Sequence, residues 1–401
     1  MMLRSNNPDI AIAQEWVSEL DTWIRTHGLC GYDPFDIKQA RLLRMIQTSP
    51  FLRKTGTALC DLFPNGMRRI LRVSPTENPK AHALTALGCL RLFELTQEQS
   101  FLDRALGHLD WLRQHASAGF HGLCWGYPFD VFGKGVDTPA GTPVGVISAI
   151  AGQAFLRAYE LTKETAPLDD AQSIAQFMLQ DLPRMDETDG ACCFGYTPTD
   201  RRRVHNANLL VVEHLTRVGA LTGDSAYTEA AEPALQFSLT HQREDGAWPY
   251  GEFAPGEPFE RNLMELVDHH HTGFVLRALH GIYKVKNDER LYDALRKGFK
   301  FYQKLVDPGG IPLNEYGRYP VDIHACAECL LCCSIISESL AGAKNIAIRS
   351  MRWSWYSMRD PESGAVFYRK YPFHTTRIIF PRWGVAWMYW ALAEYLHRFG
   401  K

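Results

Sequence analysis

The chain has 401 residues and a formal net charge of -2, with 46% hydrophobic and 22% charged residues, which is ordinary for a soluble globular protein. This near-neutral balance gives no reason to expect a nucleic-acid partner, and no apolar stretch reaches the roughly 18 residues that a membrane-spanning helix needs. Ten cysteines, several of them inside apolar helical runs, are typical of buried thiols in a reducing compartment, so we expect a cytoplasmic protein.

Apolar residues at helical spacing recur along the whole chain and predict a nearly all-helical protein. The first such segment carries Ile10, Trp16, Leu20 and Trp23 and stops at Gly28. Alternating apolar and polar residues never persist, so we expect at most small β-hairpins in loops. Helices are predicted over 9–27, 37–63, 79–96, 99–116, 144–161, 168–184, 207–221, 226–240, 289–305, 343–357 and 386–399, and after the polar junctions at 268–271 and 322–324.

One unit recurs between these helices: a Gly-aromatic turn, a polar loop, and a helix opened by polar residues. Successive copies lie roughly 50–70 residues apart, a spacing that suits repeated helix pairs. The gap from Gly31 to Gly126 is longer and could hold a degenerate unit. About six helical hairpins closed into a ring are the most economical arrangement. We therefore predict an all-α (α/α)6 toroid in which residues 1–401 form a single domain.

In such a ring, the loops that lead into one set of helices gather at one face over a rigid scaffold. The loop-to-helix junctions of this chain repeatedly carry aromatic rings, carboxylates and imidazoles. Sugar C–H faces stack on aromatic rings, and sugar hydroxyls need paired donors and acceptors, so this mixture favours a carbohydrate ligand. Carboxylate pairs can act as acid and base at a glycosidic bond. A His or Tyr beside an Arg could instead remove a proton next to a uronate carboxylate.

Five junction residues are predicted to perform the acid–base chemistry. They are Asp130, Asp268, His271, Asp322 and His324. Three consecutive histidines at a helix start point in different directions, and His271 is favoured because it directly precedes an apolar packing run.

A second set is predicted to bind the substrate. It consists of Asp36, Trp125, Tyr127, Asn208, Trp248, Tyr250, Glu252, Arg382 and Trp383. Arg382 would bind an acidic group, and the three tryptophans would stack against sugar rings. Structural alternatives remain open. Asn208 could have no role beyond capping a helix, and Trp125 and Trp248 could have no role beyond packing neighbouring hairpins against each other.

Zinc-type ligands also gather at these junctions, from Asp268 to His271 and at Asp322 and His324. No HExxH or paired CxxC spacing fixes a coordination geometry, so we expect no metal or other cofactor. Four cysteines between positions 326 and 333 lie in one continuous apolar helix, which cannot wrap four thiolates around a cluster. We interpret them as small core residues.

The junctions also carry a resemblance. The stretches GYDPFD (31–36), WGYPFD (125–130), HNAN (205–208), DGAWPYGE (245–252), DHHHTGF (268–274), YPVDIHA (319–325) and RWGVAWM (382–388) resemble a family of bacterial α/α-toroid proteins encoded in capsule, exopolysaccharide and lipopolysaccharide gene clusters. The resemblance extends over nearly the whole chain, and the order of these stretches is what makes it specific. The broader group is similar to six-hairpin glucuronyl hydrolases, N-acylglucosamine epimerases, polysaccharide lyases and terpenoid cyclases.

The resemblance implies a toroid with a role in surface-polysaccharide biosynthesis or modification. We therefore expect an enzyme that acts on a glycan or glycolipid, preferably an acidic one, as an epimerase, lyase or hydrolase. Proteins of polysaccharide assembly would be its further partners, and the sequence does not fix an oligomeric state. Two alternatives stay open: a non-catalytic glycan-binding or scaffold protein of the assembly machinery, and a metal-dependent cyclase or transferase on the same ring.

Overall fold

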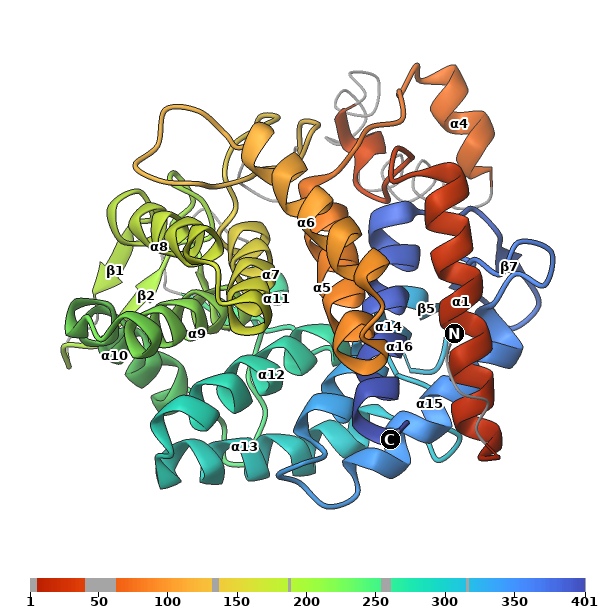
Figure 1. Cartoon of the computed structure of the whole chain (residues 1–401). Coiled ribbons are helices and arrows are strands. Elements are labelled where there is room, and N and C mark those ends of the chain that lie inside the picture. The colour runs from red at the N-terminus through yellow and green to blue at the C-terminus, as the bar shows by residue number, and fades with distance from the viewer. Residues whose placement is uncertain are drawn as a thin grey trace.

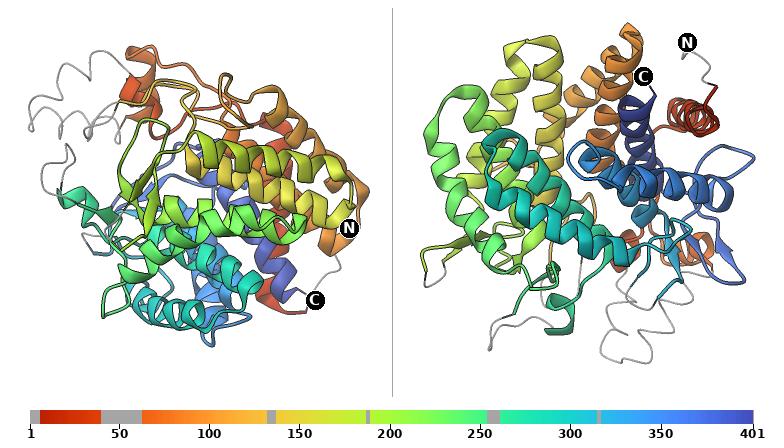
Figure 2. Two further views of the ribbon diagram at one scale, coloured as in Figure 1. Left: turned by 90° about the vertical axis from the view of Figure 1, so that its left-hand side faces the viewer. Right: turned by 90° about the horizontal axis from the view of Figure 1, so that it is seen from below.

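The computed structural model describes residues 6–39, 63–131, 137–186, 189–253, 261–314 and 317–400. The helix predicted over 37–63 lies almost wholly outside these ranges. The chain winds into paired helices arranged around a common centre (Figure 1), and the pairs can be followed from two further sides in Figure 2. The prediction of an all-α (α/α)6 toroid is confirmed.

Six inner helices form a closed ring in which each one contacts the next, and the last contacts the first. They are α5 (Pro79–Thr96), α7 (Gly145–Thr162), α9 (His205–Thr222), α12 (His269–Lys286), α14 (Ile323–Ile336) and α16 (Trp387–Phe399). An outer helix packs against each of them, in the order α6 (Gln99–Gln114), α8 (Thr165–Gln180), α10 (Ser225–Thr240), α13 (Glu289–Tyr302), α15 (Ala343–Met358) and α1 (Pro8–His27).

The tight turns from inner to outer helices repeat one local structure. Four inner helices end at a left-handed residue, namely Gln97, Lys163, Gly223 or Asn287, and the next residue is the acidic N-cap of the outer helix. A left-handed C-cap satisfies the last carbonyls of the helix and reverses the chain. Because each outer helix then runs back, all inner helices begin at the same end of the ring.

Glycines allow the inner helices to approach each other closely. A Cβ on Gly88 of α5 would lie 2.5 Å from the ring of Tyr389 on α16, and a Cβ on Gly152 of α7 would lie 2.4 Å from His214 on α9. The same holds for Gly273, whose added Cβ would lie 2.7 Å from the Glu328 side chain. Protein interiors are packed so tightly that even one extra carbon is felt. These glycines therefore set the diameter of the ring.

Short strands join neighbouring loops at the end where the inner helices begin. Strands β3 (Arg203–Val204) and β4 (Gly251–Glu252) pair the loop before α9 with the loop before α12. Strands β5 (Val321–Asp322), β6 (Arg369–Lys370) and β7 (Thr375–Thr376) do the same for the loops before α14 and α16. Two hairpins lie within single loops: β1 (Arg184–Asp186) with β2 (Cys192–Phe194) before α9, and β6 with β7 before α16. These are the small loop hairpins that the sequence predicts.

Two smaller expectations can be compared with the structure. The helix predicted over 168–184 begins earlier, at Thr165, and ends at Gln180, because Pro167 is tolerated in a first helical turn and strand β1 follows. The cysteines of α14 are confirmed as core residues, since all four are fully buried and unbridged. No helix in the described part of the chain is long and apolar enough to cross a membrane.

Helix α1 completes the outer layer by packing against α15 and α16, and this gives the first prediction (Figure 1). Trp16 of α1 is fully buried and donates its indole N–H to the Gly364 carbonyl at 3.2 Å. We expect Trp16→Ala to lower the free energy of unfolding by about 3–5 kcal/mol, as cavity-forming substitutions of large core residues do. Urea denaturation measures this.

The matched control is Tyr356→Ala on neighbouring α15, because the Tyr356 side chain is 77% exposed. It should change the free energy of unfolding by no more than about 0.5 kcal/mol. If both substitutions lowered the free energy of unfolding by the same amount, the packing of Trp16 against α15 and α16 would not be what stabilises this part of the protein.

Candidate active site

The start of the six inner helices, together with the loops that lead into them, forms one face of the ring, which we call the mouth. Four features meet there: an Asp–His pair on α12, a His–Trp stack on α14, a buried Arg at the turn before α16, and a buried Lys on α5. Their positions follow from the helix starts, because each residue lies within three positions of an inner-helix N-terminus or in the π-helical turn η3 (Pro381–Ala386). Turns of this π type occur often at functional sites.

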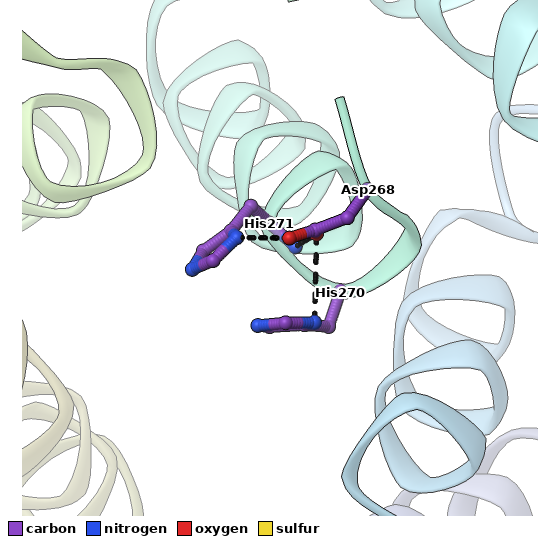
Figure 3. Close-up of side chains that lie close together, drawn as sticks. All are labelled: Asp268, His270 and His271. Carbon is purple, nitrogen blue, oxygen red and sulfur yellow. Dashed lines mark hydrogen bonds and ion pairs between the residues drawn. The ribbon is translucent and has the colours of Figure 1, made fainter. Parts of the chain in front are cut away.

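Asp268 and His271 form a hydrogen-bonded pair at the start of α12 (Figure 3). Asp268 is the N-cap: Oδ1 accepts from the His271 backbone N–H at 2.8 Å, and Oδ2 lies 2.6 Å from His271 Nδ1. The aspartate thus orients the ring and leaves Nε2 for another partner. Burial would raise the pKa of Asp268, but the neighbouring His270 and His271 hold it well below its usual range.

The surroundings of this pair keep one side of His271 open. Its side chain is 26% exposed, and its ring lies 4.6 Å from the ring of Tyr250. A crevice of about 10 Å³ beside it, lined in part by Asn206 and Tyr250, has room for one water molecule. Asn206 Oδ1 is buried without a hydrogen-bond partner and lies at this crevice. Buried water satisfies polar atoms of this kind.

His270 connects the Asp–His pair to α14. Its ring lies 4.0 Å from the ring of His271 and 5.1 Å from the ring of His324. Burial lowers the pKa of His270 to about 3, although the Asp268 carboxylate opposes this effect. His270 is therefore neutral at physiological pH.

His324 and Trp383 stack on each other, with ring centroids 4.3 Å apart. Asp322 supports this stack: it caps α14, accepts from Trp383 Nε1 at 2.7 Å, and pairs with Arg369 at 2.8 Å. His324 is only 2% exposed, and neither ring nitrogen has a hydrogen-bond partner. Burial, followed by the nearby His270 and Lys80, holds the pKa of His324 well below its usual value.

Arg382 lies under the mouth and is paired with Asp33. Its Nε and Nη2 both donate to the Asp33 carboxylate, and its guanidinium lies over the rings of Tyr127 and Trp383. Arg382 is 2% exposed, yet its Nη1 has no hydrogen-bond partner. One donor of this arginine is therefore left for another group.

Lys80, which the sequence analysis did not select, occupies the second position of α5. It is 5% exposed, and its ammonium lies over the rings of Phe274 and Trp387, at 5.6 and 5.2 Å. Burial, followed by the charges of Arg382 and Arg277, lowers the pKa of Lys80 to about 7. The sequence pattern Asn78-Pro79-Lys80 does indicate a helix start here, because Asn78 is a typical N-cap and Pro79 is favoured at the first helical position. No Gly-aromatic turn precedes it, so the recurring unit did not identify it.

Four predicted substrate-binding residues belong instead to the packed frame around the mouth. Asp36 is paired with Arg68, and Trp125 and Trp248 donate their indole N–H groups to backbone carbonyls in the core. Asn208 bonds to Phe194 N, Ala234 O and Ser238 Oγ. All four are buried, and their polar atoms are already bonded within the protein, so these atoms are not left for a ligand. Trp248 also lines the crevice beside His271. Asn206, two residues earlier, lies at the crevice because helix positions two apart face opposite sides.

Three of the remaining predicted residues lie at the mouth without joining the Asp–His pair directly. Glu252 binds His205 Nε2 at 2.9 Å, and Asp130 accepts from the Ala140 N–H in the loop before α7. Tyr127 keeps some exposed surface, and burial raises the pKa of its phenol, so it stays protonated. The structure thus brings together Asp268, His271, Tyr250, His324, Trp383 and Arg382.

Asp268, His270 and His271 also form the one group in the described ranges that could hold a metal ion, with ligand atoms within 4.8 Å of one another. Zinc needs each ligand atom roughly 2 Å away. Coordination would therefore require the 2.6 Å hydrogen bond between Asp268 and His271 to open.

The buried ammonium of Lys80 predicts an unusual dependence of stability on pH. The pKa is about 7 in the folded chain and 10.5 ordinarily, so the unfolded state binds more protons between these values, and stability rises with pH there. Lys80→Met removes the buried charge. We expect it to raise the free energy of unfolding by several kcal/mol at pH 6, a gain that shrinks by about 1.4 kcal/mol for each pH unit above 7.

Urea denaturation at pH 6, 7.5 and 9 measures this difference. Lys300→Met, on the exposed side of α13, is the control and should show no such trend. A gain for Lys80→Met that does not vary with pH would show that burial does not lower the pKa of Lys80.

The fold can now be compared with known proteins. No protein-family model matches the sequence, and no curated protein does. Solved structures match over nearly the whole chain. One is a cellobiose 2-epimerase from Bacillus thermoamylovorans B4167, with a TM-score of 0.65, 13% identity, and 96% of this chain and 98% of that one covered.

Two further structures have the same architecture. A polysaccharide lyase matches with a TM-score of 0.58 and 13% identity, covering 95% of this chain and 96% of its own. An unsaturated glucuronyl hydrolase from Streptococcus agalactiae matches with a TM-score of 0.59 and 14% identity, covering 98% and 93%. At such identities the likeness establishes the fold alone: the chain is an α/α toroid of the kind found in these epimerase, lyase and glycosidase structures.

Proposed function

We propose that this protein is an enzyme that acts on an acidic glycan by acid–base chemistry at the mouth of the toroid. The observation that carries the proposal is the Asp268–His271 pair, whose imidazole is oriented by a carboxylate and reached by solvent. An imidazole oriented in this way can act as a general base. In this role His271 is the catalytic residue, and Asp268 is a positioning residue.

The state of the carboxylates favours proton abstraction over glycoside hydrolysis. A hydrolase of the usual kind needs two free carboxyl groups, one of them with a raised pKa so that it can donate a proton. Among the described mouth residues, Asp33, Asp322 and Glu252 are each paired with a basic side chain, and the pKa of Asp268 is lowered. Epimerisation or lyase cleavage needs a base, a group that stabilises the carbanion, and a donor that returns a proton to the carbon or protonates the leaving oxygen. His271 and Arg382 supply the first two, and the protonated phenol of Tyr250 supplies the third, so these reactions are the preferred forms of the proposal.

The other mouth residues have roles in this scheme. Removal of a proton next to a carboxylate builds negative charge on that group, and a buried cation stabilises such charge strongly. Arg382, with its unpartnered Nη1, supplies one. Tyr250 and Tyr127 remain protonated because burial raises the pKa of each phenol, so both can donate to sugar oxygens. The exposed part of Trp383 offers a surface for a sugar ring.

The solved structures support the proposal at the level of class. They are a cellobiose 2-epimerase, a polysaccharide lyase and an unsaturated glucuronyl hydrolase, and all three share this ring. The motif resemblance alone extends the proposal to a role in bacterial surface-polysaccharide biosynthesis or modification, in the cytoplasm and beside polysaccharide-assembly proteins. The alternative is a non-catalytic glycan-binding protein, which the pairing of the mouth carboxylates favours.

The proposal predicts a loss of turnover in His271→Gln. A panel of uronate-containing oligosaccharides would be incubated with the enzyme in D₂O. NMR detects solvent deuterium at an epimerised carbon, and ultraviolet absorbance detects an unsaturated lyase product. We expect kcat to fall about 10²- to 10⁴-fold, which is the usual contribution of a general base, with KM nearly unchanged. Asp268→Asn should also lower kcat and move the acid limb of the pH–rate profile.

His27→Gln is the control, since His27 is exposed on the outer helix α1 and contributes nothing to the mouth. Wild-type turnover in His271→Gln would refute the proposed base. Glycan binding without turnover in the wild-type protein would favour the binding-protein alternative.

The proposed chemistry needs no metal, because the Asp268 carboxylate already orients His271. We expect activity to persist after dialysis against EDTA, and elemental analysis of the purified protein to find less than one metal ion per chain. Loss of activity on chelation, restored by zinc, would instead assign Asp268, His270 and His271 to a metal centre.

A further inference from the structure

Within the described ranges, Lys80 places a positive charge without an ion pair of its own in the floor of the mouth, which is the buried region around Phe274, Trp383 and Trp387. Among the described residues, the Lys80 ammonium has no hydrogen-bond or ion-pair partner, and its nearest neighbours are the faces of Phe274 and Trp387. Two other cations approach it, but each has its own carboxylate: Arg382 is paired with Asp33, and Arg277 with Glu328 at 2.7 Å. Of these three described cations, Lys80 alone therefore has no ion pair, and the three cations exceed the two carboxylates by one charge.

Buried donors without partners surround the same place. Arg382 Nη1 and both ring nitrogens of His324 are buried and unbonded. The His324 ring lies 4.3 Å from the ring of Trp383 and 4.9 Å from that of Trp387. Arg382 lies over the first of these rings at 4.9 Å and Lys80 over the second at 5.2 Å, so the three side chains gather around the same two tryptophans. A neutral imidazole has one N–H to donate. The floor thus offers an ammonium, a guanidinium N–H and an imidazole N–H. Buried polar groups in proteins are rarely left unbonded in this way.

We propose that Lys80, Arg382 and His324 form a subsite that binds one carboxylate group, the uronate carboxylate of the glycan. This inference rests on the proposed function, which supplies the glycan. A carboxylate carries one negative charge and has lone pairs for several donors, which matches one uncompensated cation with unfilled N–H groups beside it. A phosphate dianion would exceed that single charge.

The subsite makes carboxylate binding depend on pH. The groups that face Lys80 are Arg382 and Asp33 near η3, Arg277 and His270 on α12, and Glu328 and His324 on α14. Both histidines are neutral above pH 6, because burial lowers their pKa values, and both arginines stay charged. Lys80, with a pKa of about 7 in the empty site, is then the group that must take up a proton when a carboxylate binds at higher pH.

Isothermal titration calorimetry with two simple probes tests this. Methyl glucuronide and methyl glucoside differ at one carbon, which carries a carboxylate in the first and a hydroxymethyl group in the second. At pH 6 we expect the glucuronide to bind at least about tenfold more tightly, the size of one charge-assisted hydrogen bond. Its affinity should fall about tenfold for each pH unit above 7, with proton uptake seen as a dependence of the heat on the buffer.

Three variants complete the experiment. Lys80→Met should bind both probes equally and without pH dependence, whereas Lys300→Met should behave as wild type. His271→Gln should keep the wild-type preference and pH dependence, because binding does not require proton abstraction. The His271→Gln variant therefore separates the two proposals. Loss of turnover with unchanged binding would leave the carboxylate subsite intact, and loss of selective binding in Lys80→Met would test the subsite without testing the base.

The subsite is refuted if the two probes bind equally or not at all, if the affinity for the glucuronide does not change from pH 6 to pH 9, or if Lys80→Met binds as wild type. Inorganic phosphate that displaces the glucuronide at an equal concentration would also overturn it, because the site would then not select a carboxylate. A thermal unfolding curve confirms that Lys80→Met is folded.

Discussion

Close packing between neighbouring inner helices determines where every functional side chain of this protein lies. Glycines such as Gly88 and Gly152 let the backbones approach until the adjacent side chains touch them directly. Because all six inner helices begin at the same end of this tight ring, their N-terminal residues meet at one mouth although they are spread over some three hundred positions of sequence. The positive ends of the helix dipoles meet there as well, which favours negative charge at the mouth.

Most polar groups of the mouth are satisfied by one another, and the exceptions are what make it a candidate site. Asp322 holds Trp383, Glu252 binds His205, and Asp33 engages Arg382. These pairs fix the loops in the way that buried ionic and hydrogen-bonded groups usually do. His324 differs, because in the part of the chain that the structure describes both of its ring nitrogens are buried without a hydrogen-bonding partner. Lys80 differs because its buried ammonium lies over two aromatic rings and has no ion pair among the described residues. A protein pays for such groups in stability, and function is the ordinary reason why they persist.

Much of this arrangement could be read from the sequence, because helical periodicity and Gly-containing turns are local signals. They predicted the ring and most junctions that meet at the mouth, including Asp268, His271 and Arg382. Periodicity does not show whether a junction side chain points into the mouth or into the core. Trp125 and Trp248 were therefore expected to contact a substrate, but in the structure their indole N–H groups bond to backbone carbonyls in the core. Lys80 was missed for the opposite reason, since its environment is built by Phe274 and Trp387, nearly two hundred residues or more away.

The position of α1 has a consequence for how the chain acquires its structure. This helix packs against α15 and α16, and its Trp16 bonds to a residue 348 positions later. During synthesis the apolar face of α1 therefore stays exposed to solvent until α15 and α16 have been made. Contacts between such distant segments slow folding, and waiting apolar surfaces promote aggregation. The protein is thus expected to depend on chaperones during synthesis more than a linear array of the same hairpins would, since in such an array each unit is covered as soon as the next is made.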